Sequence, residues 1–215
     1  MSLARHRRGR LISLEGIEGV GKSTHMQFVC GRLRATGLTV LETREPGGTP
    51  EADEIRETLL KVRGGAFDPM AELLLMFAAR AVHVERLIRP ALAAGTWVVC
   101  DRFTDASYAY QGGGRGIPAS RIAALERMVL KGLKPDLTLL LDARAEVGMS
   151  RVRGRGQLDR FEQEMDGFFK RVRRVYLARA RREPRRIRIV DAGRELLAVQ
   201  AEIGALLDER LKRWT

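Results

Sequence analysis

The chain contains a complete phosphate-binding loop. Residues 16–23 are Gly-Ile-Glu-Gly-Val-Gly-Lys-Ser and match the pattern G-x-x-x-x-G-K-[ST] at every fixed position. A short apolar strand pattern precedes the loop and a helical pattern follows it, which is the context that this motif requires. In such a loop, backbone N–H groups converge on phosphate oxygens, and the helix N-terminus adds partial positive charge. We therefore predict that the chain binds a nucleoside triphosphate.

The loop residues have different expected roles. Lys22 is expected to reach the β- and γ-phosphates of ATP, and the Ser23 hydroxyl to bind Mg²⁺. A glycine-rich turn with an incidental Lys-Ser pair is the alternative, and the completeness and context of the motif argue against it. The expected ATP-binding residues are Gly16, Ile17, Glu18, Gly19, Val20, Gly21, Lys22, Ser23 and Thr24.

Strand and helix patterns alternate along the chain. The predicted strands are Leu11–Glu15, Thr39–Thr43, Trp97–Asp101, Leu137–Asp142 and Arg188–Asp191. The predicted helices are Lys22–Thr36, Ala52–Leu60, Pro69–Ala94, Ala119–Lys131, Ala145–Arg153, Phe161–Arg182 and Leu196–Arg213. This order predicts an α/β P-loop fold, with a five-stranded parallel sheet and helices on both faces. We expect a basic tail over residues 1–9 and a single domain over residues 10–215.

The net charge of +12 raises nucleic acid as a possible partner. Residues 151–188 contain 14 Lys or Arg and 5 Asp or Glu, a net charge of +9. Most of the stretch Lys170–Arg186, including Arg179, is expected to form a solvated helix face. Few aromatic side chains are interleaved with these cations, so nucleic acid is not an expected partner.

Composition also bears on the membrane and the compartment. No run of about 18 apolar residues and no signal peptide is evident, so no membrane association is expected. The two cysteines, Cys30 and Cys100, have no metal-binding spacing and are typical of buried thiols in a reducing cytoplasm.

An acidic and a basic residue follow the third predicted strand. Asp101, at the strand end beside the phosphate loop, is suited to hold Mg²⁺ directly or through water. Arg102 offers a planar fork for phosphate oxygens, although an isolated Asp-Arg pair is more often a surface ion pair. No second carboxylate follows Asp101 to activate water, as motor-type ATPases require. Transfer to a bound acceptor is therefore favoured over hydrolysis.

Four motifs in order resemble the thymidylate kinases. They are residues 15–23, residues 44–49 (Arg-Glu-Pro-Gly-Gly-Thr), Asp101-Arg-Phe103 with Ala109-Tyr-Gln-Gly112, and residues 135–142 (Pro-Asp-Leu-Thr-Leu-Leu-Leu-Asp). The resemblance extends from about Arg10 to the C-terminal helix. It implies transfer of the γ-phosphoryl group of ATP to dTMP, giving dTDP and ADP for dTTP synthesis, by a Mg²⁺-dependent cytoplasmic homodimer. The alternatives are a kinase of another (deoxy)nucleoside monophosphate and, from another class, a nucleic-acid-stimulated P-loop ATPase.

The resemblance also implies roles for individual residues toward dTMP. Arg44 and Arg102 correspond to arginines that hold the dTMP phosphate, although Arg44 alone also fits a turn flanked by an ion pair. Glu18 matches a position facing the sugar 3′-hydroxyl, and Glu45 lies beside the acceptor. Arg80, Ser107 and Gln111 match positions that contact thymine, with Tyr110 in the same wall.

Two neighbouring residues compete to stack on thymine. In many members of the family an aromatic residue lies four positions before the arginine, where this chain has Met76. Phe77 lies three positions before Arg80. Both spacings place a side chain on the helical face of Arg80, so the choice stays open at this point.

The segment Arg151–Glu162 corresponds to a short mobile lid of the family. The phosphate loop contains no arginine, so the catalytic arginine is expected in the lid, as in the enterobacterial branch. Gly154 and Gly156 give this segment freedom to close. Arg153 and Arg155 are the expected candidates, and Arg151 is the next. The expected catalytic residues are thus Lys22, Arg102, Arg153 and Arg155.

Overall fold

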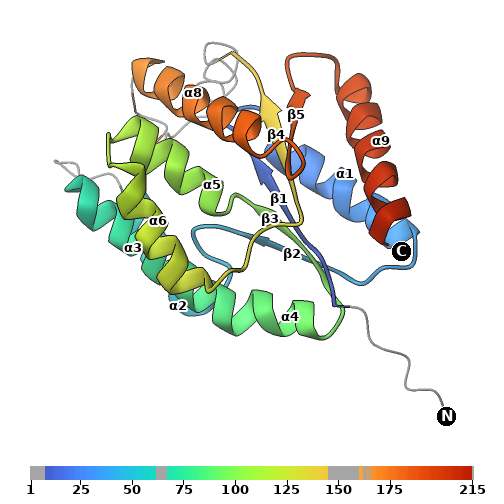
Figure 1. Cartoon of the computed structure of the whole chain (residues 1–215), viewed down its shortest axis with the longest axis horizontal. Helices are drawn as coiled ribbons and strands as arrows, with labels where there is room; N and C mark the ends of the chain where they lie inside the picture. The colour runs from blue at the N-terminus through green and yellow to red at the C-terminus, as the bar shows by residue number, and fades with distance from the viewer. Residues whose placement is uncertain (1–7, 62–66, 145–159, 162–163, 165, 215) are drawn as a thin grey trace.

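The computed structural model describes residues 8–61, 67–144, 160–161, 164 and 166–214 (Figure 1). The predicted helix Ala145–Arg153, the lid arginines Arg151, Arg153 and Arg155, and residues 1–7 of the predicted tail lie outside the described residues.

Five parallel strands form one sheet, which confirms the predicted fold. They are β1 (Leu11–Glu15), β2 (Val40–Arg44), β3 (Trp97–Asp101), β4 (Leu137–Asp142) and β5 (Ile187–Asp191), in the order β2-β3-β1-β4-β5. β1 pairs with β3 on one side and with β4 on the other, so its carboxyl end lies between the carboxyl ends of these two strands. Ligands of such sheets bind outside the carboxyl ends of the strands.

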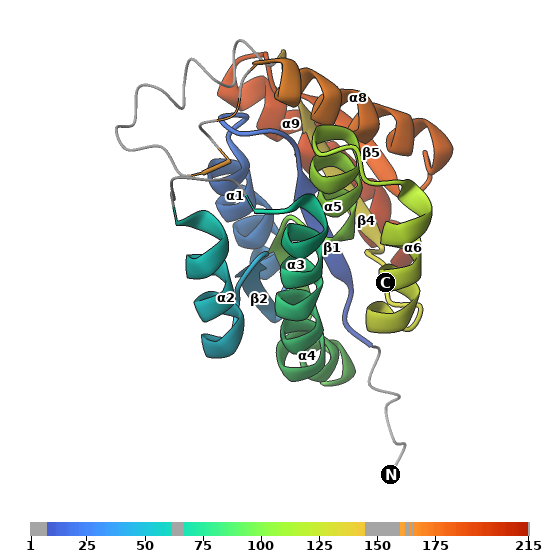
Figure 2. The ribbon, with the colours of Figure 1, turned by 90° about the vertical axis from the view of Figure 1, so that its left-hand side faces the viewer.

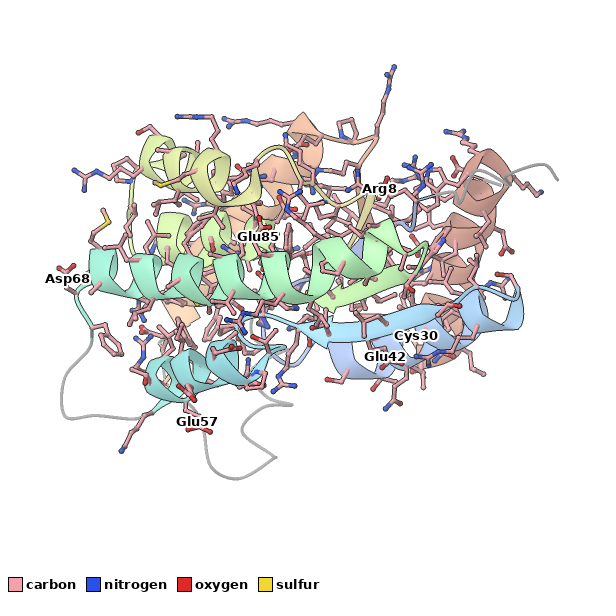
Figure 3. All side chains as sticks on the ribbon, turned by 90° about the horizontal axis from the view of Figure 1, so that it is seen from below. Arg8, Cys30, Glu42, Glu57, Asp68 and Glu85 are labelled. Carbon is pink, nitrogen blue, oxygen red and sulfur yellow. The ribbon has the colours of Figure 1, made fainter. Side chains whose placement is uncertain are left out.

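The helices largely follow the sequence prediction. They are α1 (Lys22–Ala35), α2 (Pro50–Leu60), α3 (Pro69–His83), α4 (Arg89–Ala93), α5 (Thr104–Ser107), α6 (Ala119–Leu130), α8 (Asp166–Arg182) and α9 (Leu196–Trp214), with π-helical segments η1 (Val84–Ile88) and η2 (Tyr108–Gly114). The predicted helix Pro69–Ala94 is thus divided, because Pro90 has no N–H to continue an α-helical hydrogen-bond ladder. Figure 3 shows this run from Asp68 past Glu85, with Glu57 on the neighbouring α2.

The sheet is covered on both faces, as predicted. Ile12 and Leu14 of β1 pack in the cluster that contains α1, whereas Leu11 packs with Val84 and Ile88 of η1 on the other face. Figures 1 and 2 show α1 and α9 on one side of the sheet and α3 and α4 on the other. Burial on both faces explains why these strands are near-continuous apolar runs.

The segment after β3 is helical, although no helix was predicted there. α5 and η2 cover residues 104–114 and end in the run Gly112-Gly-Gly114, a sequence with poor helix propensity. A Cβ atom on Gly114 would lie 2.4 Å from the Phe168 ring, and one on Gly113 would lie 2.7 Å from Val175. The glycines therefore permit α8 to pack directly on η2, and this tertiary contact overrides the local propensity.

The prediction that Arg179 lies on a solvated face is wrong. Its side chain is 18% exposed and donates through Nε to Asp105 Oδ1 at 2.5 Å. Its guanidinium also lies 3.8 Å from the centre of the Tyr108 ring. Arg186 binds the same carboxylate at 2.6 and 3.0 Å. Burial opposes the charge of Asp105, but the two arginines outweigh it and hold its pKa below the ordinary value.

The other arginines of the stretch Lys170–Arg186 include both solvent-exposed and ion-paired side chains. Arg174, Arg181 and Arg182 are exposed, as predicted for a solvated face. Arg173 instead binds both oxygens of Asp142 at 2.7 Å, which ties α8 to the end of β4.

Within the described residues, no helix combines the length and the apolar character needed to cross a membrane.

Candidate active site

The phosphate loop joins β1 to α1 at the centre of the sheet edge. Gly16 has φ +143°, and a Cβ atom there would lie 2.4 Å from the Leu141 carbonyl oxygen, so the tight exit from β1 requires glycine. Ile17 and Val20 are buried in the core beneath the loop, while Ser23 and Thr24 are exposed.

Lys22 points into the loop. Its ammonium donates to the carbonyl oxygens of Ile17 at 2.9 Å and Gly16 at 3.3 Å. Burial, and then the positive charge of Arg102, lower the pKa of Lys22 to about 8. Both effects favour an anion beside this ammonium, since an anion restores the stability of the charged form.

Asp101 and Ser23 offer oxygen atoms next to the loop. Asp101 ends β3 and is in register with Leu14 of β1. Its Oδ1 atom is buried and has no hydrogen-bond partner within the described part of the chain. An orphaned carboxylate oxygen and a hydroxyl fit Mg²⁺, which is held by one or two carboxylates together with substrate phosphates. The described residues contain no cluster of three acidic, His or Cys side chains, and such a site needs none.

A cavity opens beside the phosphate loop. It contains six of the residues predicted to bind the acceptor, and it is lined by Glu18, Glu45, Pro46, Arg56, Leu60, Met76, Arg102, Ala106, Tyr110, Gln111 and Phe161. Its volume of about 70 Å³ is well below the roughly 300–1,000 Å³ of typical ligand pockets. Ion pairs among its own lining residues fill much of the space.

Arg102 forms the main ion pair across this cavity. Its Nη2 donates to Glu18 Oε1 at 2.7 Å and to the Tyr110 hydroxyl at 2.9 Å. The Tyr110 hydroxyl in turn donates to the second oxygen of Glu18. Burial raises the pKa of Glu18, but Arg102 and Lys22 outweigh burial, and the net pKa is lowered. Arg102 also has φ +67°, a strained backbone conformation that is found most often at functional sites.

Arg80 is held in place by a buried network. Its Nε donates to Glu45 Oε2 at 2.7 Å, and its Nη1 donates to Ser107 Oγ at 2.9 Å. His83 links the other oxygen of Glu45, at 3.1 Å, to the Thr43 hydroxyl, at 2.7 Å. Ser107 is fully buried and does not line the cavity, so it contacts Arg80 and supports the wall from behind.

The structure distinguishes Met76 from Phe77. Met76 lines the cavity. Phe77 packs in an apolar cluster with Leu73 and Tyr108, and its ring lies 4.7 Å from the Arg80 guanidinium. Of the two residues that the sequence left open, Met76 therefore faces this cavity.

Glu72 orients Gln111 and was not predicted. Gln111 Nε2 donates to Glu72 Oε1 at 2.9 Å, while Gln111 Oε1 is buried and has no partner among the described residues. Glu72 is fully buried, accepts from Arg115 at 3.3 Å and forms an ion pair with Arg160 at 2.8 Å. Because a carboxylate only accepts, it directs the amide nitrogen of Gln111 toward itself and leaves the carbonyl oxygen available at the cavity. The spacing of Glu72, Met76 and Arg80 by four residues is the sequence signal that places Glu72 on this face.

Comparison with known proteins agrees with this geometry. Residues 14–203 match the family model described as Thymidylate kinase. The chain belongs to the thymidylate kinase family. It is 59% identical over 209 residues to the thymidylate kinase of Chromohalobacter salexigens, covering 96% of this chain and 99% of that protein. It is 57% identical over 202 residues to the thymidylate kinase of Pseudomonas putida strain W619, covering 94% and 98% of the two chains.

A solved thymidylate kinase has the same fold. The crystal structure of thymidylate kinase from Ehrlichia chaffeensis superposes with a TM-score of 0.76 at 31% identity, covering 94% of this chain and 99% of that chain. The family model extends over the phosphate loop, the cavity and α8, and therefore over the whole candidate site described above.

Like Phe77 and Ser107, two further predicted acceptor residues, Arg44 and Arg80, do not line the cavity. Arg80 is 1% exposed and is held behind the cavity by the network described above. Arg44 ends β2, and its side chain is 52% exposed and pairs with Asp53 at 3.0 Å. It is not among the residues that line the cavity. A role for Arg44 at the acceptor phosphate thus requires its side chain to leave Asp53.

Proposed function

We propose that the chain transfers the γ-phosphoryl group of ATP to dTMP, giving dTDP and ADP. The observation that carries this assignment is the cavity that adjoins the phosphate loop and contains Glu18, Arg102, Tyr110, Met76 and Gln111. Membership of the thymidylate kinase family supports the same acceptor.

When dTMP binds, its phosphate replaces Glu18 as the partner of Arg102. Arg102 presents a guanidinium fork to the cavity, and that fork is now paired with Glu18. A phosphate that replaces this carboxylate keeps Arg102 paired and opens space between the two side chains. Arg44 binds the same phosphate after release from Asp53. Glu18, once free, accepts from the sugar 3′-hydroxyl.

The thymine ring lies against Met76 and is recognised by fixed polar groups. Gln111 Oε1, which has no partner within the described chain, accepts from the thymine N3–H group. Arg80, which is 1% exposed and held by Glu45 and Ser107, donates to thymine O4 once the base has widened the cavity. Both groups are held before the base arrives, so little side-chain entropy is lost on binding.

ATP binds on the phosphate loop, with Lys22 at its β- and γ-phosphates. Mg²⁺ would be held by Ser23 and Asp101, and when bound it neutralises charge on the phosphate oxygens. Lys22 exchanges its two carbonyl acceptors for phosphate oxygens, and Arg102 holds the acceptor oxygen in line with the γ-phosphate. Catalysis in this arrangement is positioning and electrostatic stabilisation, without a covalent intermediate.

The catalytic arginine comes from the segment of residues 151–162. No guanidinium is available in residues 16–23, and Arg153 and Arg155 are the candidates. A positioned arginine contributes about 10³-fold or more to phosphoryl transfer.

Two further properties accompany this function. Leu74 on α3 and Met128 on α6 are 50% and 66% exposed, and these neighbouring helices offer an apolar surface for a homodimer. Light scattering of the wild-type protein and the Leu74→Glu variant tests this assembly.

A cytoplasmic location is supported by Cys30 and Cys100, because both are thiols that form no disulfide bond.

The function is tested by measuring ADP release with dTMP, dUMP, dCMP, AMP or no acceptor. Turnover should require Mg²⁺ and dTMP. One missing methyl group in an apolar pocket costs about 1–3 kcal/mol, so dUMP should be a slower substrate and not an inert one. Equal rates with AMP or dCMP would refute the dTMP assignment and leave the phosphate-loop kinase assignment standing.

A further inference from the structure

A second and larger cavity lies at the opposite end of the sheet. It has a volume of about 840 Å³ and lies where β1 and β3 begin and α9 ends. The candidate active site lies at the carboxyl ends of the same strands. Because β1 has five residues, the two ends of the sheet are about 16 Å apart. Figure 1 shows the start of β1 and the end of α9 at this end, and Figure 3 labels Arg8 there.

This cavity is strongly basic. Six cationic side chains and one acidic side chain, that of Asp136, line it, which gives the lining a net charge of +5. Two glutamates outside the lining pair with members of this set, Glu85 with Arg89 and Glu209 with Arg213. The cations come from four separate parts of the chain and are Arg8, Arg10, Arg89, Lys131, Lys134 and Arg213. The fold thus brings together positive charges that no local sequence run accounts for.

Two of these cations are held in fixed positions. Arg10 donates to Asp136 Oδ1 at 2.7 Å, and Asp136 Oδ2 accepts from the Leu11 backbone N–H at 2.9 Å. The Arg10 guanidinium also lies 5.3 Å from the centre of the Trp214 ring. Arg89 donates to the Leu130 carbonyl oxygen and, at 3.1 Å, to Glu85. Preorganised guanidinium groups bind an anion at a lower entropic cost than free ones.

Other cations at the cavity mouth are poorly neutralised. Arg8 and Lys134 have no ion pair with any described residue, and Lys131 is 3.7 Å from Glu85. Like charges gathered around a concave surface repel one another, and the concavity focuses their field. A multivalent anion relieves this repulsion more effectively than a monovalent one.

We propose that this cavity, defined by the six cations, binds an oligophosphate anion. The ligand is inorganic triphosphate or the triphosphate group of a nucleotide. The volume lies within the roughly 300–1,000 Å³ of small-molecule sites, and guanidinium forks match phosphate oxygens. A compact cavity at one end of the molecule favours a small anion over a nucleic acid strand, which needs an extended track. The site is separate from the active site and does not rest on the proposed function.

The test is equilibrium dialysis of inorganic triphosphate against the full chain. The phosphate loop is expected to take one triphosphate, so the wild-type chain should bind two. In the variant Arg8→Ala/Lys134→Ala, the second site should weaken by at least about 10-fold, because two charges that face the anion are lost. The matched control is Arg181→Ala/Arg182→Ala, which removes the same charge from an exposed face of α8 and should change the affinity less than about twofold.

Four further measurements complete the test: turnover, thermal midpoint, nucleotide binding and oligodeoxynucleotide binding. dTMP-dependent turnover and the thermal midpoint should be unchanged in both double variants, which separates this site from catalysis and from folding. ATP and dTTP are compared with inorganic triphosphate. Equal affinity identifies the phosphate chain as the ligand, and tighter binding of a nucleotide identifies the nucleotide. The proposal is overturned if Arg8→Ala/Lys134→Ala binds triphosphate with the stoichiometry and affinity of the wild type, if both double variants lose equal affinity, or if an oligodeoxynucleotide binds there more tightly than triphosphate.

Discussion

Replacement of Arg179 by alanine tests how the buried charges hold α8 on the sheet. Removal of one member of a buried ion pair usually costs about 3–5 kcal/mol. In Arg179→Ala, Arg186 still binds Asp105 through two hydrogen bonds. We therefore expect loss of the Arg179–Asp105 pair to lower the free energy of unfolding by about 2 kcal/mol. Loss of the guanidinium from the face of Tyr108 adds about 0.5–1 kcal/mol. The free energy of unfolding should therefore fall by about 2.5–3 kcal/mol.

The assay is urea unfolding followed by circular dichroism. If the free energy of unfolding falls by about 2.5 kcal/mol per molar urea, the urea concentration at the unfolding midpoint should be about 1 M lower in Arg179→Ala than in the wild type. Arg181→Ala is the control on the same helix, because Arg181 is exposed, and its free energy of unfolding should change by less than about 0.5 kcal/mol. If the two variants differ by less than about 0.5 kcal/mol, Arg179 contributes no more than a surface charge and the reasoning fails.

Three other predictions concern catalysis, packing and pH. Arg153→Ala or Arg155→Ala should lower kcat by about 10²-fold or more with little change in KM for dTMP, whereas near-normal kcat in the double variant would place the catalytic arginine elsewhere. Gly114→Ala should destabilise by about 1–3 kcal/mol because its Cβ meets the ring of α8, while Gly31→Ala, with open space, should stabilise by about 0.5–1 kcal/mol; equal unfolding midpoints would refute this. Because folding lowers the pKa of Asp105, its ionised carboxylate stabilises the fold above the ordinary pKa, and this stabilisation is lost as pH falls through the lowered value. The free energy of unfolding of Asp105→Asn should therefore fall less than that of the wild type between about pH 6 and pH 3. Parallel curves of unfolding free energy against pH would contradict this.

The sequence was sufficient for the sheet and the phosphate loop. β1, β3 and β4 have the predicted bounds, since strands buried on both faces are apolar at nearly every position. The loop was recognisable because its glycines and its lysine have fixed spacing. Both signals are local, so no knowledge of distant contacts was needed.

Features that depend on distant partners were not predictable. The helix over Thr104–Gly114 depends on α8 packing against glycines, and glycine-rich sequence by itself predicts a loop. Arg179 was assigned to solvent because its partner, Asp105, lies 74 residues away in the chain. Glu72 and His83 were overlooked for the same reason, since their roles depend on the residues that the fold places opposite them.

Phosphorus-31 NMR of a reaction mixture tests the central claim most directly. The protein is mixed with ATP, dTMP and Mg²⁺, and the products are followed over time. If the cavity beside the phosphate loop holds the acceptor, dTDP and ADP should accumulate in equal amounts, with no inorganic phosphate above the background without protein. Release of inorganic phosphate without dTDP would show that water is the acceptor, and it would contradict the account of the site.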